Sequence, residues 1–304
     1  MKTRRTLPLL LLALVLLASL ALAQRYRRRN MEGPIYYAEG GTPVDVRVVK
    51  TAREVASHST GTPEWKYTPG FSRDVFTFAR IIRDNDPDGA WSSGTWITDF
   101  PDSDLNLSFR TQQMTSMRVD PNGRILRLTD KDLCDFPWIY MVEPGALLLQ
   151  EEDVPILRKY LLNGGFLMAD DFWGEWQWEC FEAQIKRVFP DRDFVELPME
   201  HPIFHCVFDL NVGKNKLQVP NAHLGANSQY TGVTWETHPQ KDGSREACTE
   251  MHVRAILDDK GRIMVIATHN TDNGDGWERE GENDWFFHEF SEKRAFPLGI
   301  NIIF

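Results

Sequence analysis

The sequence predicts an α/β fold, and the stretch from residue 136 to 189 carries that prediction. Two apolar runs of strand length, Trp138–Val142 and Phe166–Ala169, are joined by a segment with helical spacing. A second helical pattern follows, with apolar residues on one face and a proline at its end: Trp178, Phe181, Ile185, Val188 and Pro190. Two apolar strands joined by a helix form a parallel crossover unit whose strands are buried on both faces. We therefore expect a mostly parallel central sheet between two layers of helices.

The helix between the two runs has recognisable ends. Glu151, Glu152 and Asp153 crowd its start, where the positive end of the helix dipole favours acidic side chains. Asn163–Gly165 supplies the glycines that a left-handed cap needs. These signals predict a helix between about residues 153 and 162.

Further elements are predicted on both sides of this unit. Asp102–Asp104 is typical of a helix start, residues 210–250 are loop-rich, and Asp258–Gly261 predicts a hairpin turn. Strands are expected at Phe76–Ile82, Ile125–Leu128, Phe194–Leu197, Met251–Leu257 and Ile263–Thr268, and an apolar helix begins at Phe296.

The N-terminus predicts export. Lys2, Arg4 and Arg5 precede an unbroken apolar run from Leu7 to Leu17, and Ala21-Leu22-Ala23 fits a signal-peptidase site. We expect a signal peptide over residues 1–23, a linker or peripheral segment over 24–70 and one α/β domain over 71–304. The protein is then periplasmic or secreted. The alternative is an uncleaved anchor, although a membrane span needs roughly 20 apolar residues.

Charge and cysteine use exclude several classes of protein. The chain has 34 Lys and Arg against 44 Asp and Glu, and without the three basic residues of the signal segment the net charge is −13. An acidic chain without a basic patch is not expected to bind nucleic acid. The four cysteines form no Cys-x-x-Cys pair, so we prefer buried free thiols, with one or two disulfides as the alternative. The sequence contains no nucleophile elbow, phosphate-binding loop or dinucleotide fingerprint.

Candidate ligand-binding residues follow the predicted strands, because the carboxyl ends of parallel strands meet at one edge of the sheet. Glu143 follows the first central strand, and Asp170 and Asp171 end the second. Adjacent strand residues point to opposite faces, so only one aspartate of the pair is expected to reach a given cleft. Of Trp173, Trp176 and Trp178, we expect one to lie at the site, where it suits a sugar; Trp178 is in phase with the core.

The segment His269–Glu278 is the second source of candidates. It places His269, Asn270, Asp272 and Asp275 behind a strand end, a combination that suits a divalent metal or a polar ligand. The alternative is a turn-rich loop whose Asp and Asn side chains bond their own backbone. His201 precedes a proline and approaches the same edge from the loop after residue 197, although a structural histidine is the commoner outcome.

The sequence resembles the bacterial family called domain of unknown function 4159, which is related to the class I glutamine amidotransferase-like fold. The resemblance covers about residues 70 to 304 and rests on the segments Thr98–Asn106, Tyr140–Gly145, Tyr160–Leu167, Asp170–Gly174, His201–His205 and His269–Asn270. A looser similarity, at His201–Ile203 and from Gly261 to His269, is to trehalose-utilisation-type proteins. These resemblances imply a flavodoxin-like sandwich and a sugar-type ligand. The nucleophilic Cys of the amidotransferases is missing from the turn at residues 170–174, so glutaminase chemistry is not expected.

Two functions remain open from the sequence. The first is a binding module for a glycan or an envelope protein, which needs no cofactor. The second is a carboxylate- or metal-dependent hydrolase acting on a carbohydrate-type substrate. Both place Glu143, Asp170 or Asp171, and His269 in one cleft, with Trp173 and residues 270–278 as its walls.

Overall fold

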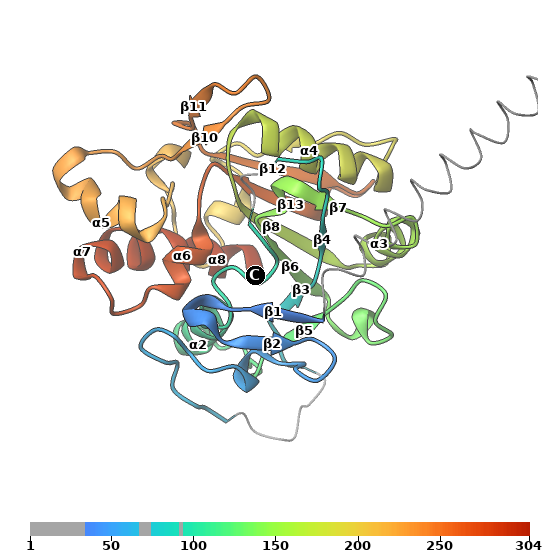
Figure 1. Cartoon of the computed structure of the whole chain (residues 1–304), viewed down its shortest axis with the longest axis horizontal. Coiled ribbons are helices and arrows are strands. Elements are labelled where there is room, and N and C mark those ends of the chain that lie inside the picture. The colour runs from blue at the N-terminus through green and yellow to red at the C-terminus, as the bar shows by residue number, and fades with distance from the viewer. Residues whose placement is uncertain (1–33, 67–73, 91–93) are drawn as a thin grey trace, which may run out of the picture.

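A seven-stranded sheet organises the protein in the computed structural model, which describes residues 34–66, 74–90 and 94–304 (Figure 1). The strand order is β5-β3-β6-β8-β13-β12-β9. The bounds are β3 Ala79–Ile81, β5 Arg124–Leu126, β6 Trp138–Val142, β8 Phe166–Phe172, β9 Val195–Glu196, β12 His252–Leu257 and β13 Ile263–His269. The predicted α/β class is confirmed, whereas the expected signal peptide lies outside the described residues.

The first five strands in this order run parallel, and β12 and β9 extend the sheet in antiparallel fashion. The predicted hairpin joins β12 to β13, and β13 pairs parallel to β8 with Ala267 opposite Ala169. The carboxyl ends of β6, β8 and β13 therefore meet at one edge of the sheet. Three two-stranded sheets lie outside it, formed by β1 Ile35–Tyr37 with β2 Pro43–Asp45, β4 Asp84–Asn85 with β7 Leu147–Leu148, and β10 Thr237–Pro239 with β11 Arg245–Ala247.

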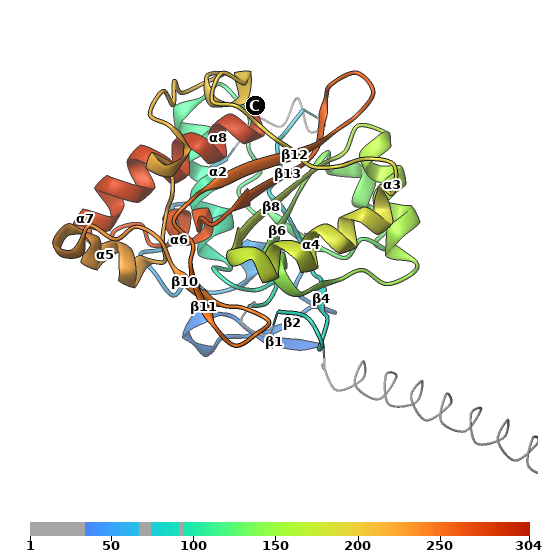
Figure 2. The ribbon, with the colours of Figure 1, turned by 90° about the horizontal axis from the view of Figure 1, so that it is seen from above.

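Helices cover both faces of the sheet (Figure 2). On one face, α3 (Asp153–Leu162) and α4 (Gly174–Val188) pack on Leu167 and Ala169. On the other, α2 (Asp102–Met114), α6 (Asn273–Glu278), the π-helix η8 (Phe287–Ala295) and α8 (Phe296–Ile303) form one apolar cluster with Met168. Leu167, Met168 and Ala169 thus point alternately to the two faces, as expected of a strand that is covered on both sides. The remaining helices are α5 Ala222–Thr231, α7 Asp284–Phe286 and the short 3-10 turns η1 Glu39–Gly41, η2 Ala52–Glu54, η4 Leu133–Asp135, η5 Pro144–Ala146, η6 Pro202–Phe204 and η7 Lys214–Lys216.

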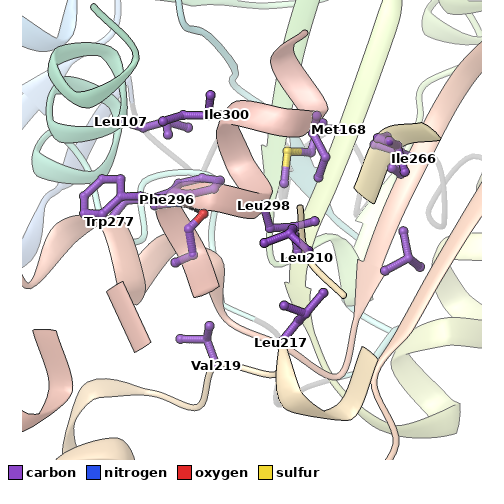
Figure 3. Close-up of a cluster of buried hydrophobic side chains, with 14 of the residues drawn as sticks. Leu107, Met168, Leu210, Leu217, Val219, Ile266, Trp277, Phe296, Leu298 and Ile300 are labelled. Atoms are coloured by element: carbon purple, nitrogen blue, oxygen red, sulfur yellow. Dashed lines mark hydrogen bonds between the residues drawn. The ribbon is translucent and has the colours of Figure 1, made fainter. Parts of the chain in front are cut away.

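The core beneath α8 fixes the helices that carry the site (Figure 3). Leu298 and Ile300 of α8 are fully buried with Trp277 of α6 and Leu107 of α2. Truncating a buried leucine or isoleucine to alanine typically costs about 2–5 kcal/mol. This packing holds α6 at the carboxyl edge of the sheet.

Two stretches differ from expectation. The loop-rich region 210–250 contains α5 and the β10–β11 hairpin, and part of the predicted loop 270–278 is helix α6. Neither helix shows a sustained apolar period, and α6 begins because the Asp272 side chain accepts a hydrogen bond from the Asp275 amide (2.7 Å). Tertiary packing and a cap, rather than an amphipathic pattern, specify these helices.

The segment before the sheet packs against the domain. In residues 34–66, which we call the N-terminal segment, Ala38, Val44, Ala52 and Val55 are buried against Trp96, Phe100 and Ile125 among others. The four cysteines, all within the described ranges, are free, but Cys134 and Cys206 are exposed rather than buried. Among the described residues, no helix has the length and apolar character needed to cross a membrane.

Candidate functional site

A cavity of about 560 Å³ opens at the carboxyl edge of the sheet. Its walls come from the strand ends of β6 and β8, from α6, from the β10–β11 hairpin and from the N-terminal segment. Carboxylates dominate the lining: Glu39, Asp99, Glu143, Asp171, Glu236, Asp272, Asp275 and Glu282. Arg279 is the only Lys or Arg among the described lining residues, so the cavity is strongly negative.

The backbone is left-handed at several of the residues that surround this edge. Asp99, Glu143, Asp171 and Asn270 have φ angles of 62°, 46°, 57° and 60°. A positive φ is uncommon outside glycine, and such strained positions concentrate at functional sites. At each of these positions, the left-handed backbone points the polar side chain in a direction that a regular extended backbone would not allow.

Three aspartates in this cavity form a close group, which we call the Asp triad: Asp99, Asp171 and Asp272. One oxygen from each lies within 4.8 Å of the others. Asp99 is 2% exposed, and its Oδ2 has no hydrogen-bond partner. The side-chain hydrogen bonds of the other two aspartates, within the described ranges, come from neutral donors: Trp173 Nε1 donates to Asp171 Oδ1 (2.9 Å), and Asp272 accepts from the Asp275 amide at the start of α6. Among the described residues, no Lys, Arg or His forms an ion pair with the triad.

Burial and mutual repulsion make the triad costly in its charged form. Burial raises the pKa of all three carboxyls well above the usual range, and neighbouring carboxylates raise each further. The pKa of Glu143 is also raised by burial, although Thr98 Oγ1 donates to Glu143 Oε2 (2.6 Å) and opposes the shift. A bound cation would reverse this balance, because it favours the ionised carboxylates.

The neighbouring acidic group already has one positively charged partner, Arg279. Arg279 Nε lies 2.7 Å from Glu278 Oε2 and 3.4 Å from Asp275 Oδ1, and its Nη2 lies 2.7 Å from Glu39 Oε2. His58 lies between Glu39 and Glu278. In the described part of the chain, the Asp triad thus differs from this group in having no ion-paired cation; the buried Arg80 lowers the pKa of Asp99, but burial and Asp275 outweigh it.

A His–Glu pair also lines this cavity. His238 Nε2 and Glu236 Oε2 are 2.8 Å apart, and the His238 ring stacks on Trp173 with centroids 5.9 Å apart. Burial raises the pKa of Glu236, but the bond from His238 and those from Asn221 outweigh it, so the net shift is downward. Sequence reasoning missed this pair because the β10–β11 hairpin was expected to be loop. Its signal was the Glu-x-His spacing, which puts both side chains on one face of an extended segment.

The family model described as "domain of unknown function (DUF4159)" matches residues 77–304. The chain belongs to this family. The membership predicted from the sequence is confirmed, and no curated protein matches the chain. Glu39 precedes the matched region, so part of the cavity wall of this DUF4159 protein comes from outside it.

The structure brings five of the predicted candidates to the cavity of the DUF4159 domain: Glu143, Asp171, Trp173, Asp272 and Asp275. Trp173 is the tryptophan at the site, whereas Trp178 packs in the core, as its phase indicated.

Asp170 is turned away and serves the fold of the DUF4159 domain. Its carboxylate accepts hydrogen bonds from Asn273 Nδ2 (2.7 Å), the Gly274 amide (3.2 Å), Tyr140 and Thr268. Burial raises its pKa to about 6, against the lowering effect of these bonds. Asp170 therefore anchors the start of α6 to β8.

The remaining candidates do not line the cavity. His269 packs between Phe172 and Trp178, and its Nε2 lies 3.1 Å from the Gly174 carbonyl. Burial lowers its pKa to about 3, so the ring is neutral. His269 continues the alternation of Val265 and Ala267 along β13, so its ring faces the α3–α4 layer rather than the cavity.

Asn270 and His201 have structural contacts. Asn270 accepts from the Gly174 amide and donates to the Glu250 carbonyl, both at 2.8 Å, and so ties two loops together. His201 caps η6 by accepting from the Ile203 amide (3.2 Å), and burial lowers its pKa.

Proposed function

We propose that the cavity binds one divalent cation through Asp99, Asp171 and Asp272, and that the domain is a hydrolase acting on a carbohydrate-type substrate. The observation that carries this proposal is the buried Asp99 carboxylate, whose Oδ2 lacks a hydrogen-bond partner and lies beside two further buried carboxylates that have only neutral donors. Keeping three such carboxylates ionised inside a protein requires a compensating positive charge.

The chemistry of the triad indicates the class of cation. Three carboxylates are hard oxygen ligands, which suit Mg²⁺, Mn²⁺ or Ca²⁺ rather than soft metals. Ligand oxygens on opposite sides of such an ion are about 4–5 Å apart, given metal–oxygen distances of about 2.0–2.6 Å. The spacing within 4.8 Å supports this coordination without a large rearrangement.

The His238–Glu236 pair supports hydrolysis. A histidine held by a carboxylate can accept a proton from a water molecule that attacks the substrate, while a bound cation makes that water more acidic. Glu143 has a raised pKa and suits the opposite role of proton donor to the leaving group. Trp173 lines the cavity, but its indole is 3% exposed, stacks on His238 and donates its N–H to Asp171. The sugar-type ligand therefore rests on the resemblance to trehalose-utilisation-type proteins. The same resemblance makes glycan binding without hydrolysis the second candidate.

The arrangement of the sheet supports a flavodoxin-like, amidotransferase-like fold. Numbered along the chain, the parallel strands β3, β5, β6, β8 and β13 lie in the order 2-1-3-4-5. Ligands of such sheets bind where the order reverses, here between β3 and β6, and Glu143 directly follows β6. We further propose a periplasmic or secreted location, in which glycans are available as substrates and an envelope protein is an alternative partner.

Metal analysis combined with an activity screen tests the proposal. The protein is dialysed against Mn²⁺, freed of loose metal and assayed on nitrophenyl glycosides and acetylated oligosaccharides. We expect Asp99→Asn to bind one Mn²⁺ fewer per chain than the wild type and to lose metal-dependent turnover, and the exposed control Asp135→Asn to keep both. Metal without turnover, together with retained oligosaccharide, would favour the glycan-binding module. Metal-free protein would contradict the cation site.

A further inference from the structure

We infer that Glu39, His58 and Glu278 form a second metal site, suited to a transition metal such as Zn²⁺. It differs from the Asp triad in containing an imidazole. The assignment stands on its own contacts and does not require the triad to be occupied.

The three side chains already converge. His58 Nε2 lies 2.8 Å from Glu278 Oε1 and 3.0 Å from Glu39 Oε2, and the three atoms lie within 4.8 Å of one another. Zinc binds nitrogen and oxygen ligands at about 2.0–2.2 Å in a tetrahedron, which places the ligand atoms roughly 3.4 Å apart. A small outward adjustment of each side chain would make room for the ion.

Close approach is not accompanied by hydrogen bonding. Both ring nitrogens of His58 and both carboxylate oxygens of Glu278 are buried and make no aligned hydrogen bond. The Glu278 side chain is fully buried and that of His58 is 12% exposed. Because these atoms lie close together without aligned hydrogen bonds, the lone pair of His58 Nε2 and Oε1 of Glu278 are available to coordinate a metal ion.

Asp102 contacts the His58 ring in the way that carboxylates next to metal-bound histidines orient those ligands. Its Oδ2 accepts a hydrogen bond from the His58 backbone amide (3.1 Å) and lies 3.0 Å from Nδ1. A carboxylate next to the distal ring nitrogen of a metal-bound histidine fixes its tautomer and raises its basicity. The buried Asp102 would leave Nε2 as the coordinating atom.

Arg279 contacts both glutamates of this site. It contacts Oε2 of Glu278, whereas His58 faces Oε1 of the same carboxylate, so Oε1 remains for the metal. Arg279 also donates to Oε2 of Glu39, the oxygen that faces His58, so Glu39 would bind the metal through the second lone pair of Oε2 or through Oε1. A rival interpretation makes His58 a protonated partner of the two glutamates, with no metal at all.

Two of the three proposed ligands lie in the N-terminal segment. Glu39 and His58 precede the matched region 77–304, while Glu278 lies within it in α6. The site would thus join the N-terminal segment to the catalytic edge of the domain.

Calorimetric titration with Zn²⁺ in saturating Mg²⁺ tests the inference, because Mg²⁺ occupies the oxygen-only triad and binds poorly to imidazole. We expect one Zn²⁺ per wild-type chain, none in His58→Gln, and one in the control His288→Gln, whose histidine pairs with Glu292 on the surface. Asp99→Asn should still bind one Zn²⁺, which separates this site from the triad.

Glu39→Gln provides a second test, because the Glu39 side chain is 39% exposed and its loss should not prevent folding. We expect at least a tenfold weaker affinity for Zn²⁺ in this variant. A wild-type chain that takes up no Zn²⁺, or unchanged binding in both His58→Gln and Glu39→Gln, would overturn the inference. The first of these results would favour a protonated His58.

Discussion

Replacing Asp99 by asparagine should stabilise the metal-free protein. Two unit charges 4.8 Å apart repel by about 3.5 kcal/mol at an effective dielectric constant of 20 and about 0.9 kcal/mol in water. Asp99 borders a cavity and faces two other carboxylates, so we expect Asp99→Asn to raise the free energy of unfolding by roughly 1–3 kcal/mol. Asparagine tolerates the left-handed backbone at this position, so the substitution adds no strain.

With the cation bound, the wild type should be more stable than Asp99→Asn. A ligand at 100 times its dissociation constant stabilises the folded state by about 2.7 kcal/mol, and Asp99→Asn should lose most of that gain. Thermal unfolding in EDTA and in excess Mn²⁺ measures both effects. Each kcal/mol of change in the free energy of unfolding should shift the midpoint temperature Tm by about 2–4 °C. Asp135→Asn should shift neither curve.

Two results would refute the reasoning. One is an Asp99→Asn variant that is less stable than the wild type in EDTA, which would make Asp99 a structural residue. The other is equal stabilisation of both proteins by Mn²⁺, which would place the cation elsewhere.

Five further predictions concern the triad, Asp170, the cysteines and the N-terminus. Divalent-cation affinity should rise between pH 5 and pH 8 in calorimetric titrations, because the raised pKa of each triad carboxyl means that protons must leave before the ion binds; a flat profile would contradict this. In EDTA, the free energy of unfolding measured with denaturant should fall as the pH rises. The pKa of Asp170 is raised from 3.8 to about 6, so the folded protein holds this proton more tightly than the unfolded chain. Asp170 should therefore make the protein about 3 kcal/mol more stable below pH 4 than above pH 6. Gly274→Ala should weaken Mn²⁺ binding at least tenfold without removing a charge, because the added Cβ would lie 2.0 Å from Asp99 Oδ2; unchanged affinity would show that the carboxylate is not held there for a ligand. Replacing all four cysteines should leave activity intact in a folded protein, and N-terminal sequencing of the exported protein should begin at Gln24, whereas Met1 would indicate an anchor.

The sequence predicted the parts of the fold that depend on local signals. Strand β6 and the first four residues of β8 are continuous apolar runs, and α3 and α4 have acidic starts or apolar faces, so periodicity identified them. α6 was missed because a six-residue helix with two glycines shows no apolar period, and its cap and packing decide its conformation.

The candidate site was predictable only where a residue follows a parallel strand. Glu143 and Asp171 lie at strand ends, so topology alone brought them together. Asp99, which precedes α2, and Glu236, which precedes the β10–β11 hairpin, reach the cavity through loops whose course no pattern specifies. His269 shares the sheet face of Val265 and Ala267, and its position after the strand did not show that α4 covers this side and separates the ring from the cavity.

The packing of the N-terminal segment affects how the protein can be divided. A fragment starting at residue 77, where similarity to the family begins, would lose the cover that Val44 and Ala52 give to Phe100 and Ile125. The bared apolar surface would make such a fragment prone to self-association. It would also free Arg279 from Glu39 and leave Glu278 without its histidine. For this chain the unit of folding therefore begins at least some 40 residues before the unit of homology.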